Sequence, residues 1–445
     1  MKAGSLRNLI SNIASASRQA FSGKARPGHN GDIADMCKRL LQIRAEASAI
    51  SLAVEIIETY AGLDDDAKLA FFRVLLNEFL PNPEVLGEAI EIYQANPTPD
   101  THMKMVKAAD SPRQTLLRAI NMAPEGTAAI VAMREDLNRF LPRHPRLLPV
   151  DSDMVYLLRL WFNRGFLTLE RIDWNTPAAI LEKLIAYEVV HEIQGWDDLR
   201  RRLEKDRRFF AFFHPALPEE PLVFVEVALM KGLTDKIACV LQQDNPCELS
   251  NERPDTAIFY SINNCQPGLK GVSFGDFLIK HVTDKLSAEL DHIKTFSTLS
   301  PIPGFRTWLD DVLKFTPGEL PLAEAERKIL AVLSDDGWHE DEGLCAELQP
   351  VMLTLCAHYL LNVKKHGEPI DPAARFHLRN GARLERINWL GNPSAKGLQQ
   401  SAGMLVNYVY EPKKVTENHE AYVNEGQIVA SAAVQQLLKA RVIAA

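Results

Sequence analysis

The feature that most limits the fold of this chain is a change in hydrophobic periodicity part-way along it. From about residue 33 to residue 162, apolar residues recur at three- and four-residue spacing, as in ADMCKRLLQIRAEASAISLAVEIIETYAGL. That spacing places apolar side chains along one face of a helix. From residue 207 the pattern changes to continuous apolar runs such as RRFFAFFHP and EPLVFVEVALM, which are typical of buried strands. The chain is therefore expected to contain a helical region followed by a region built on a sheet.

Prolines and glycines divide the first region into separate helices and mark its end. The first long helix stops at Gly62, and PNPEVLGEAIEIYQANP is bracketed by prolines, which end helices. The sequence shows no repeat of fixed period. RHPRLLPVDSD then marks a domain boundary near residue 148. We therefore expect a helical bundle that ends there.

The second region alternates strand-like and helix-like segments. TAIFYSIN, KTFSTLS, RLERINWL and NYVYEP have the composition of strands, and SFGDFLIKHVTDKLSAELDHI has the spacing of an amphipathic helix. Helical segments return from about residue 304 to residue 370. The pattern predicts an α/β or α+β domain with a sheet of several strands.

Composition limits the partners of the chain. Its 445 residues are enough for two or three domains. Lys and Arg number 50 against 58 Asp and Glu, a net charge of −8, which argues against a broad nucleic-acid-binding face. No apolar run reaches the roughly 18 residues of a membrane-spanning helix. We expect neither nucleic acid nor membrane as a partner.

Cysteine and histidine spacing gives no sign of a metal site. No CxxC pair, HxxxH or HExxH pattern occurs. Scattered cysteines in a long chain are expected to be buried free thiols in a reducing compartment. The six are Cys37, Cys239, Cys247, Cys265, Cys345 and Cys356.

The first 30 residues contain five basic residues, several serines and no Asp or Glu. That composition resembles a mitochondrial presequence. It also fits a flexible basic N-terminus on a cytoplasmic protein, which we favour. The predicted location is cytoplasmic, with the mitochondrial matrix as the alternative.

A glycine-containing segment, CQPGLKGVSFGDF at 265–277, follows a predicted strand and opens a predicted helix. Such a loop can turn backbone N–H groups toward one point beside a helix N-terminus, which suits a phosphate group. Its spacing is neither that of a Rossmann fingerprint nor that of a Walker loop. A flexible strand-to-helix turn is the other interpretation.

FSTLSPIPGF at 296–305 places three hydroxyl side chains directly before a proline-containing turn. Pro301 and Pro303 fix the backbone and remove donors, so the turn is rigid. A strand, glycine loop, helix and strand in succession place 265–277 beside 296–300, which makes Ser300 a candidate site residue. A serine that satisfies its own turn is the alternative. Ser297 and Thr298 are expected only to pack.

Two later segments carry further candidates. His377 in ARFHLRNGARLERINWL is a candidate general acid or base, with His214, His281 and His292 as competitors. It also fits a core or surface histidine. In SAGMLVNYVYEP, Tyr408 and Tyr410 alternate with Val409 and share one face of a strand. Such tyrosines pack a core or reach a pocket.

Taken together, four stretches resemble the malonyl-CoA decarboxylase family over most of residues 150–412. They are FFAFFHPALPEEPLVFVEVAL, FYSINNCQPGLKGVSFGDFLIKHV, FSTLSPIPGFRTWL and ARFHLRNGARLERINWLGNPSAKGLQQSAGMLVNYVY. The resemblance implies an α+β protein, with an all-helical bundle domain followed by a GNAT-like mixed-sheet catalytic domain. The predicted division is a flexible basic N-terminus at 1–30, a helical oligomerisation domain at 31–148 and the catalytic domain at 149–445. It also implies a homo-oligomer, either a dimer or a tetramer.

The resemblance assigns roles to residues that match the family's motifs. The family's catalytic serine precedes Pro-Ile-Pro-Gly and falls on Ser300, and its histidine, in F-H-L-x-N-G-A, falls on His377. The family tyrosine at the end of the N-Y-x-Y strand falls on Tyr410. The segment implied to bind the pyrophosphate of coenzyme A is Lys270, Gly271, Val272, Ser273, Phe274, Gly275 and Asp276.

The coenzyme A loop departs from the general acetyltransferase pattern. That pattern is Gln/Arg-x-x-Gly-x-Gly/Ala, and here Gln266 is present but Leu269 replaces the first glycine. Ser273 stands where some family members carry an acidic residue. A role for that carboxylate is therefore not carried over to this chain.

The implied activity is decarboxylation of malonyl-CoA to acetyl-CoA and CO2 through a thioester enolate. Ser300 would position the carboxylate and His377 would donate the proton. Because the thioester accepts the electrons, the resemblance implies no cofactor beyond the coenzyme A of the substrate, and no metal. Three alternatives stay open: a GNAT-type acyltransferase that uses acyl-CoA, an acyl-serine mechanism, and a non-catalytic protein that binds coenzyme A.

Overall fold

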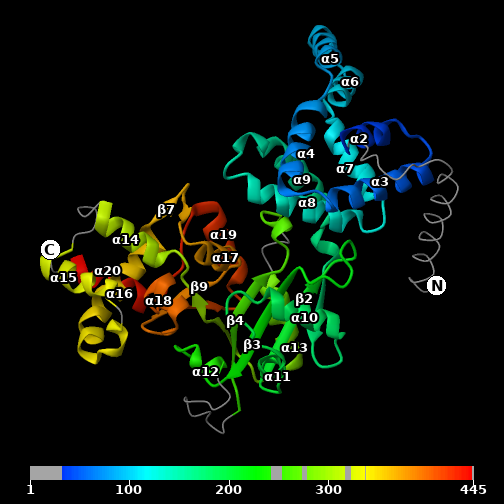
Figure 1. Cartoon of the computed structure of the whole chain (residues 1–445). Coiled ribbons are helices and arrows are strands. Elements are labelled where there is room, and N and C mark those ends of the chain that lie inside the picture. Colours follow the sequence, from blue (N-terminus) through cyan, green and yellow to red (C-terminus); the bar gives the residue numbers. More distant parts are fainter. Residues whose placement is uncertain (1–32, 242–252, 273–277, 316–321, 336, 443–445) are drawn as a thin grey trace. The chain divides into compact units, whose positions relative to one another are not determined.

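The computed structural model describes residues 33–241, 253–272, 278–315, 322–335 and 337–442 (Figure 1). Contacts divide the chain into two compact units. The first contains residues up to Leu167 together with two short segments from later in the chain, His214–Glu219 and Gln266–Phe274. The second contains the remainder.

The first unit is helical, as the periodicity predicts. Its α-helices are α2 (Ile33–Gln42), α3 (Glu46–Ala61), α4 (Asp65–Glu78), α5 (Pro83–Ala95), α6 (Pro99–Ala109), α7 (Pro112–Asn121), α8 (Gly126–Phe140) and α9 (Leu148–Trp161). Helix starts follow local chemistry: Asp64 accepts the Ala67 N–H at the start of α4, and Asn82 followed by Pro83 begins α5. α9 begins where the sequence places the end of the helical domain, and that division of the chain stays a prediction.

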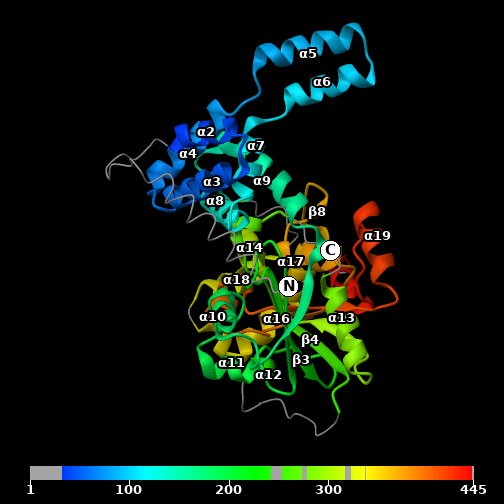
Figure 2. The same cartoon turned by 90° about the vertical axis from the view of Figure 1, so that its right-hand side faces the viewer.

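The core of the first unit is built from buried apolar faces of α3, α4, α7, α8 and α9. Tyr60 packs edge-on against Phe71 and Phe72, and Leu117, Ile130 and Met154 are fully buried. α5 and α6 form a hairpin that extends away from these helices (Figure 2). Apolar side chains on this hairpin are exposed, among them Val85, Met103 and Val106.

The second unit is built on a mixed sheet. Its strands run in the order β1 (Thr168–Ile172), β2 (Arg207–Phe213), β3 (Val223–Met230), β4 (Thr256–Asn264), β5 (Thr295–Thr298), β10 (Leu405–Tyr410) and β6 (Ser300–Pro301), and β9 (Arg383–Asn388) also pairs with β10. β4 and β5 are parallel, and the other pairs are antiparallel. A helical region followed by a mixed-sheet region confirms the α+β class.

Helices cover both faces of the sheet. α10 (Ala178–Tyr187) and α11 (Trp196–Arg202) pack with Phe209, Ala211 and Phe213 of β2. α13 (Leu278–Glu289) contacts the opposite face through Phe210 and Phe212. Coverage on both sides explains why every residue of β2 and β3 is buried and why both strands read as continuous apolar runs.

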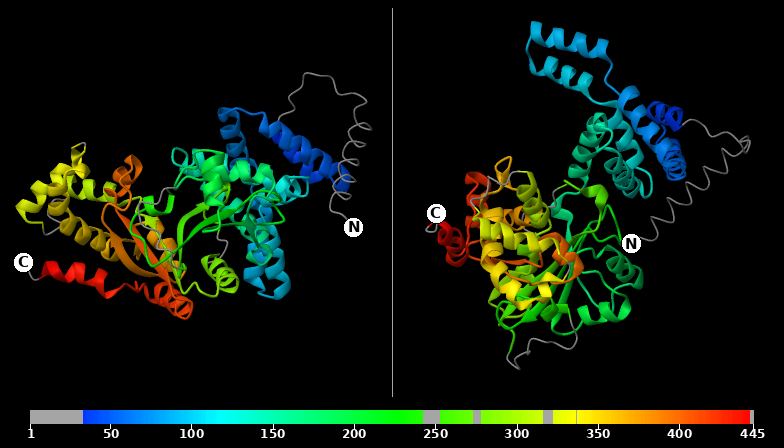
Figure 3. Two further views of the ribbon diagram at one scale, coloured as in Figure 1. Left: turned by 90° about the horizontal axis from the view of Figure 1, so that it is seen from below. Right: turned by 60° about the vertical axis from the view of Figure 1, so that its left-hand side comes forward.

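The second unit contains eight further α-helices among the described residues. They are α12 (Ala238–Leu241), α14 (Phe305–Phe315), α15 (Glu324–Ala331), α16 (Glu342–Asn362), α17 (Pro372–Arg379), α18 (Ala395–Ser401), α19 (Val415–Glu425) and α20 (Ala432–Val442). A separate two-stranded sheet joins β7 (Lys364–Lys365) to β8 (Glu368–Pro369). Figure 3 shows α20, in red, beside the strands and helices of this region, and it packs against α16 and β9.

One helix in the described part of the chain, α16, is long and apolar enough to cross a membrane by length and composition. It buries Leu348, Met352, Leu355 and Leu360 inside the second unit. Buried core helices pass the same test, so α16 is weak evidence for a membrane span. The expectation of no membrane partner stays a prediction.

Among the cysteines that the structure describes, Cys239 departs from the expected free thiols, and Cys247 lies outside the described residues. Cys37, Cys265, Cys345 and Cys356 are free, and all but Cys345 are buried. Cys239, in contrast, is disulfide-bonded. The expectation is wrong for Cys239 because scattered spacing along the sequence does not report which thiols the fold brings together.

Candidate active site

Ser300 lies at the junction of two short strands that pair with β10. Thr298 ends β5, Ser300 opens β6, and Ser300 faces Val406 across the antiparallel pair. The expected rigid corner is therefore also a strand edge, where Pro301 pairs with Leu405 without needing an N–H bond. The Ser300 side chain is 5% exposed. Pairing of β6 with β10 therefore fixes the position of the Ser300 backbone, and burial limits the movement of its hydroxyl.

His377 is brought to Ser300 by α17, although 77 residues separate the two in sequence. The imidazole Nε2 lies 2.9 Å from the Ser300 Oγ. His377 is buried, and Asp371 caps the helix that carries it. The structure thus pairs the two residues that the resemblance names.

Two tyrosines of β10 fix the other sides of the imidazole. The Tyr410 hydroxyl lies 2.8 Å from His377 Nδ1. The Tyr408 ring stacks on the imidazole, with centroids 4.6 Å apart and planes inclined by 25°. The alternation of strand side chains places both tyrosines on the same face, as the sequence predicts.

The hydrogen bonds form a directed chain. The Ser300 hydroxyl donates to Thr298 Oγ1 at 2.9 Å, and Thr298 Oγ1 also accepts the Tyr408 N–H at 3.1 Å. Because a serine hydroxyl has one proton, the Ser300 Oγ then accepts from His377 Nε2–H. Nδ1 in turn accepts the Tyr410 proton. The network therefore fits a neutral imidazole that carries its proton on Nε2.

Burial favours the uncharged form of both His377 and Tyr410. Burial lowers the pKa of His377 to about 3, so the imidazole is neutral at pH 7. Burial also raises the pKa of Tyr410 well above its ordinary value, so its hydroxyl keeps its proton. The site carries no charge of its own before a ligand enters.

Thr298 is a member of this network that the sequence did not single out. It was expected only to pack, but its hydroxyl accepts from both Ser300 and Tyr408. The signal was present, because residues two apart on a strand share a face, but the intervening break between β5 and β6 obscured it.

The competing histidines lie elsewhere. His214 packs on Phe162, with ring centroids 5.0 Å apart, and His281 packs on Phe212 at 6.4 Å. The Nδ1 of His292 lies 3.0 Å from the Arg253 guanidinium. His377 is therefore the candidate acid or base that the fold places beside Ser300.

The loop implied to bind coenzyme A is described up to Val272. Ser273, Phe274, Gly275 and Asp276 lie outside the described residues. Lys270 is exposed and Gly271 adopts a φ of 79°, which suits glycine. This part of the loop belongs to the first compact unit, whereas Ser300, His377 and Tyr410 belong to the second.

Helices of the first unit hold this loop through its carbonyl groups. Arg134 of α8 donates to the Gly268 carbonyl at 2.7 Å and pairs with Asp151 at 2.8 Å. Arg159 of α9 donates to the Gly271 carbonyl at 3.1 Å. A side chain on Gly268 would place its Cβ 2.0 Å from the Val131 carbonyl oxygen. No pattern in the sequence indicates these contacts, which join segments more than 100 residues apart.

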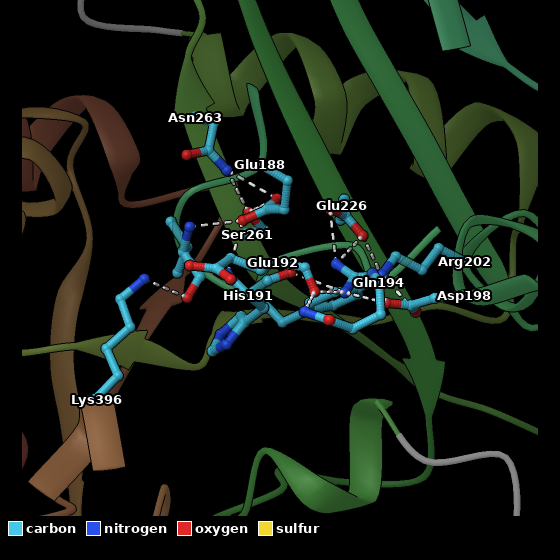
Figure 4. Close-up of polar contacts among 12 residues, drawn as sticks. Glu188, His191, Glu192, Gln194, Asp198, Arg202, Glu226, Ser261, Asn263 and Lys396 are labelled. Atoms are coloured by element: carbon cyan, nitrogen blue, oxygen red, sulfur yellow. Dashed lines mark hydrogen bonds and ion pairs between the residues drawn. The ribbon is translucent and has the colours of Figure 1, made fainter. Parts of the chain in front are cut away.

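A second buried polar cluster lies on the α10–α11 side of the sheet (Figure 4). The Glu188 carboxylate accepts from the Ser261 hydroxyl at 2.6 Å, from Asn263 at 2.8 Å and from the His191 N–H at 2.7 Å. Glu226 is fully buried beside Arg202, whose Nη1 lies 3.2 Å from both carboxyl oxygens.

Burial raises the pKa of Glu226 well above its ordinary value, and the charge of Glu188 adds to this effect. Burial also acts to raise the pKa of Glu188, but hydrogen bonds from Glu226, Ser261 and the His191 N–H outweigh it and leave that pKa lowered. The two pKa directions, raised for Glu226 and lowered for Glu188, favour the proton on Glu226, and the Arg202 guanidinium acts against this at Glu226. All these partners are internal, so the cluster is structural.

Within the described residues, no group of three or more His, Cys, Asp or Glu side chains is arranged to hold a metal ion. The expectation that the protein needs no metal or cofactor stays a prediction.

Comparison with known proteins agrees with the resemblance seen in the sequence. The model of the malonyl-CoA decarboxylase C-terminal domain matches residues 165–444, and that of the N-terminal domain matches residues 79–162. The chain is 33% identical over 419 residues to the mitochondrial malonyl-CoA decarboxylase of Anser anser anser, covering 87% of this chain and 83% of that protein.

Solved structures give the same result. The malonyl-CoA decarboxylase from Rhodopseudomonas palustris is similar with a TM-score of 0.88 and 45% identity, covering 92% of this chain and 100% of that one. The malonyl-CoA decarboxylase from Agrobacterium vitis is similar with a TM-score of 0.86 and 44% identity, covering 92% and 99%.

Proposed function

The chain belongs to the malonyl-CoA decarboxylase family and is an enzyme of that activity, and we propose that Ser300 and His377 carry out its chemistry through a thioester enolate. The observation that best supports this is the 2.9 Å contact between Ser300 Oγ and His377 Nε2, two buried and uncharged side chains.

The reaction sets three requirements. The bond between the carboxylate and the α-carbon breaks, its electron pair moves into the thioester carbonyl, and CO2 leaves. The resulting enolate then takes one proton at the α-carbon to give acetyl-CoA. Because the thioester itself accepts the electron pair, we propose that no cofactor and no metal takes part beyond the coenzyme A of the substrate.

Ser300 is proposed to position the substrate carboxylate. Its hydroxyl donates to Thr298 in the free protein and would turn to the carboxylate when malonyl-CoA binds. A neutral donor suits this task, because a cation would stabilise the anion that must be lost and so favour the ground state. Thr298 is left with the Tyr408 N–H as its donor.

His377 is proposed to supply the proton. It is neutral when the site is empty. Negative charge that develops on the thioester oxygen as CO2 leaves favours the protonated form, and the proton is taken from solvent. The imidazolium can stabilise the enolate oxygen, an interaction worth about 3–4 kcal/mol in other enzymes, and can give its proton to the α-carbon. Tyr410, whose hydroxyl lies 2.8 Å from Nδ1, is proposed to orient the ring.

The coenzyme A part of the substrate is proposed to bind at the glycine-containing loop. The assigned residues are Lys270, Gly271, Val272, Ser273, Phe274, Gly275 and Asp276. The exposed ammonium of Lys270 and the backbone N–H groups of a turn are suited to a pyrophosphate. We also propose a homo-oligomer, and the cytoplasmic location stays a prediction.

Replacing Ser300 with Ala tests the proposal. Decarboxylation should fall by orders of magnitude, because the carboxylate loses its positioning donor, while affinity for coenzyme A should change little. The assay follows CO2 and acetyl-CoA formed from malonyl-CoA. Near wild-type turnover in this variant would end the proposal.

An acyl-serine mechanism is the second candidate, because the same 2.9 Å contact suits a nucleophile and its base. In the free protein the Ser300 hydroxyl donates its hydrogen bond to Thr298 Oγ1, so a nucleophilic Ser300 would first have to turn toward His377. Incubation with a thioester substrate, acid quenching and mass measurement would detect an acyl group on Ser300. The same incubation with an amine present would detect acyl transfer, which the GNAT-type alternative requires.

A further inference from the structure

The segments that carry Ser300 and His377 are tied together by one buried carboxylate. Asp371 is 1% exposed and lies directly before α17. One of its oxygens accepts the Ala374 N–H at 2.9 Å, and the Ala373 N–H also donates to it. The Gly304 N–H also acts on this carboxylate, and Gly304 is close to it: a Cβ on Gly304 would lie 4.0 Å from Asp371 Oδ2. Asp371 therefore receives donors from the start of the His377 helix and from the turn that follows Ser300.

Both connections are short and stiff. Gly304 stands four residues after Ser300, and Pro301 and Pro303 fix the backbone between them. His377 stands six residues after Asp371 on a continuous helix. A carboxylate that holds Gly304 and the first turn of α17 thus limits how far Ser300 and His377 can move relative to one another.

A third element, α16, also contacts the Asp371 carboxylate. The Tyr359 hydroxyl of α16 donates to the second oxygen of Asp371 at 3.4 Å. The Tyr359 ring packs on Phe305 and Trp308 of α14, with centroids 5.5 and 5.1 Å away. A Cβ on Gly304 would lie 2.5 Å from the Tyr359 hydroxyl, so this approach requires a glycine.

Burial raises the pKa of Asp371, while the hydrogen bonds that its carboxylate accepts act against that rise and favour the ionised form. The carboxylate lies at the N-termini of two helices, α14 and α17, where a negative charge is favourable. It accepts from four donors, and only a group with no N–H or O–H of its own accepts them all. An amide in its place donates from one side and must give up at least one of these partners.

We propose that Asp371 is a positioning residue that sets the Ser300–His377 geometry by holding both segments, without touching the substrate. The inference rests on the proposed function of that pair. It accounts for the buried carboxylate, the glycine at 304 and the tyrosine at 359 by a single requirement.

The test is Asp371→Asn in the full-length protein. One carboxylate oxygen becomes an NH2 group, which cannot accept, so the amide must give up at least one of the donors that hold the two segments. We expect kcat to fall at least tenfold, while the KM for malonyl-CoA and the affinity for coenzyme A stay within about twofold, because binding groups are untouched. Asp341→Asn is the matched control. Asp341 caps α16 by accepting the Leu344 N–H at 3.0 Å, is not in contact with the pair, and should keep wild-type kcat.

Ser300→Ala, measured in the same assay, separates the two proposals. If Ser300→Ala is inactive and Asp371→Asn keeps wild-type kcat, the positioning role is wrong and the proposed function stands. If Ser300→Ala keeps full turnover, both are wrong. A proportional loss of kcat and of coenzyme A affinity in Asp371→Asn would indicate general misfolding and also contradict the positioning role.

Tyr359→Phe covers the case in which Asp371→Asn does not fold. It keeps the carboxylate and the ring but removes one donor, so kcat should fall severalfold with KM unchanged. Wild-type kcat in Tyr359→Phe, combined with an unfolded Asp371→Asn, would overturn the proposal.

Discussion

At the scale of single residues, the proposed mechanism depends most on the charge state of His377. Its pKa is lowered to about 3 by burial, while the imidazole keeps hydrogen-bond partners on both nitrogens. In that mechanism the neutral imidazole becomes protonated as negative charge develops on the enolate oxygen.

This low pKa predicts a pH-dependent loss of stability. Below the ordinary pKa near 6.5 the unfolded chain takes up a proton that folded His377 does not, so stability falls as pH falls toward 3. Between pH 6.5 and pH 5 the contribution is about 2 kcal/mol. Urea unfolding of wild type and His377→Gln at pH 7 and pH 5 measures it. The loss should be smaller in the variant, and an equal loss in both would contradict a buried neutral His377.

At the scale of elements, the two buried glutamates beside β3 and β4 also predict a pH effect, of the opposite sign. The pKa of Glu226 is raised by burial, so its contribution is present at low pH and lost as pH rises through the folded-state value. Glu226→Gln mimics the protonated form, and should match wild-type stability at pH 7 within about 1 kcal/mol.

As pH rises from neutral, the same variant should lose less stability than wild type in urea unfolding. Glu220→Gln, at a partly exposed glutamate that pairs with Lys183, is the matched control and should follow wild type. A large loss in Glu226→Gln at pH 7 would mean that Glu226 is ionised there.

The loop that follows β4 gives a prediction about packing within the first unit. Gly268→Ala places a Cβ 2.0 Å from the Val131 carbonyl oxygen and should destabilise the loop by about 1–3 kcal/mol. Gly87→Ala, on α5 with no atom within 4 Å of the added Cβ, should be neutral or slightly stabilising. Thermal unfolding and the KM for malonyl-CoA measure both variants. An unchanged unfolding midpoint and KM in Gly268→Ala would contradict this prediction, because the loop would then have moved to accept the added Cβ at no cost in stability.

At the scale of the whole molecule, the sequence predicted what depends on short-range periodicity. The helices up to residue 162 and the strands β2, β3 and β4 follow from apolar spacing and proline positions. The pairing of Ser300 with His377 did not follow from any spacing, because β10 and α17 bring together residues 77 apart. The family resemblance named these residues, and the roles of Thr298 and Asp371 were missed by both routes.

The sequence also could not predict which compact unit contains residues 266–272, because that depends on long-range contacts. Residues 266–272 were expected to serve the sheet domain, yet they belong to the compact unit of the N-terminal helices. Their partners, Arg134 and Arg159, stand on helices more than 100 residues earlier. Such contacts leave no periodic signal, so only the folded structure reports them.

The central claim is tested most directly by the turnover of Ser300→Ala beside Ser297→Ala. Both serines are buried within three residues of each other, but Ser297 donates to the Thr298 carbonyl and has no contact with His377. The rate of CO2 release from malonyl-CoA should fall by at least a hundredfold in Ser300→Ala and stay near wild type in Ser297→Ala. Equal rates in the two variants would contradict the claim that Ser300 acts on the substrate.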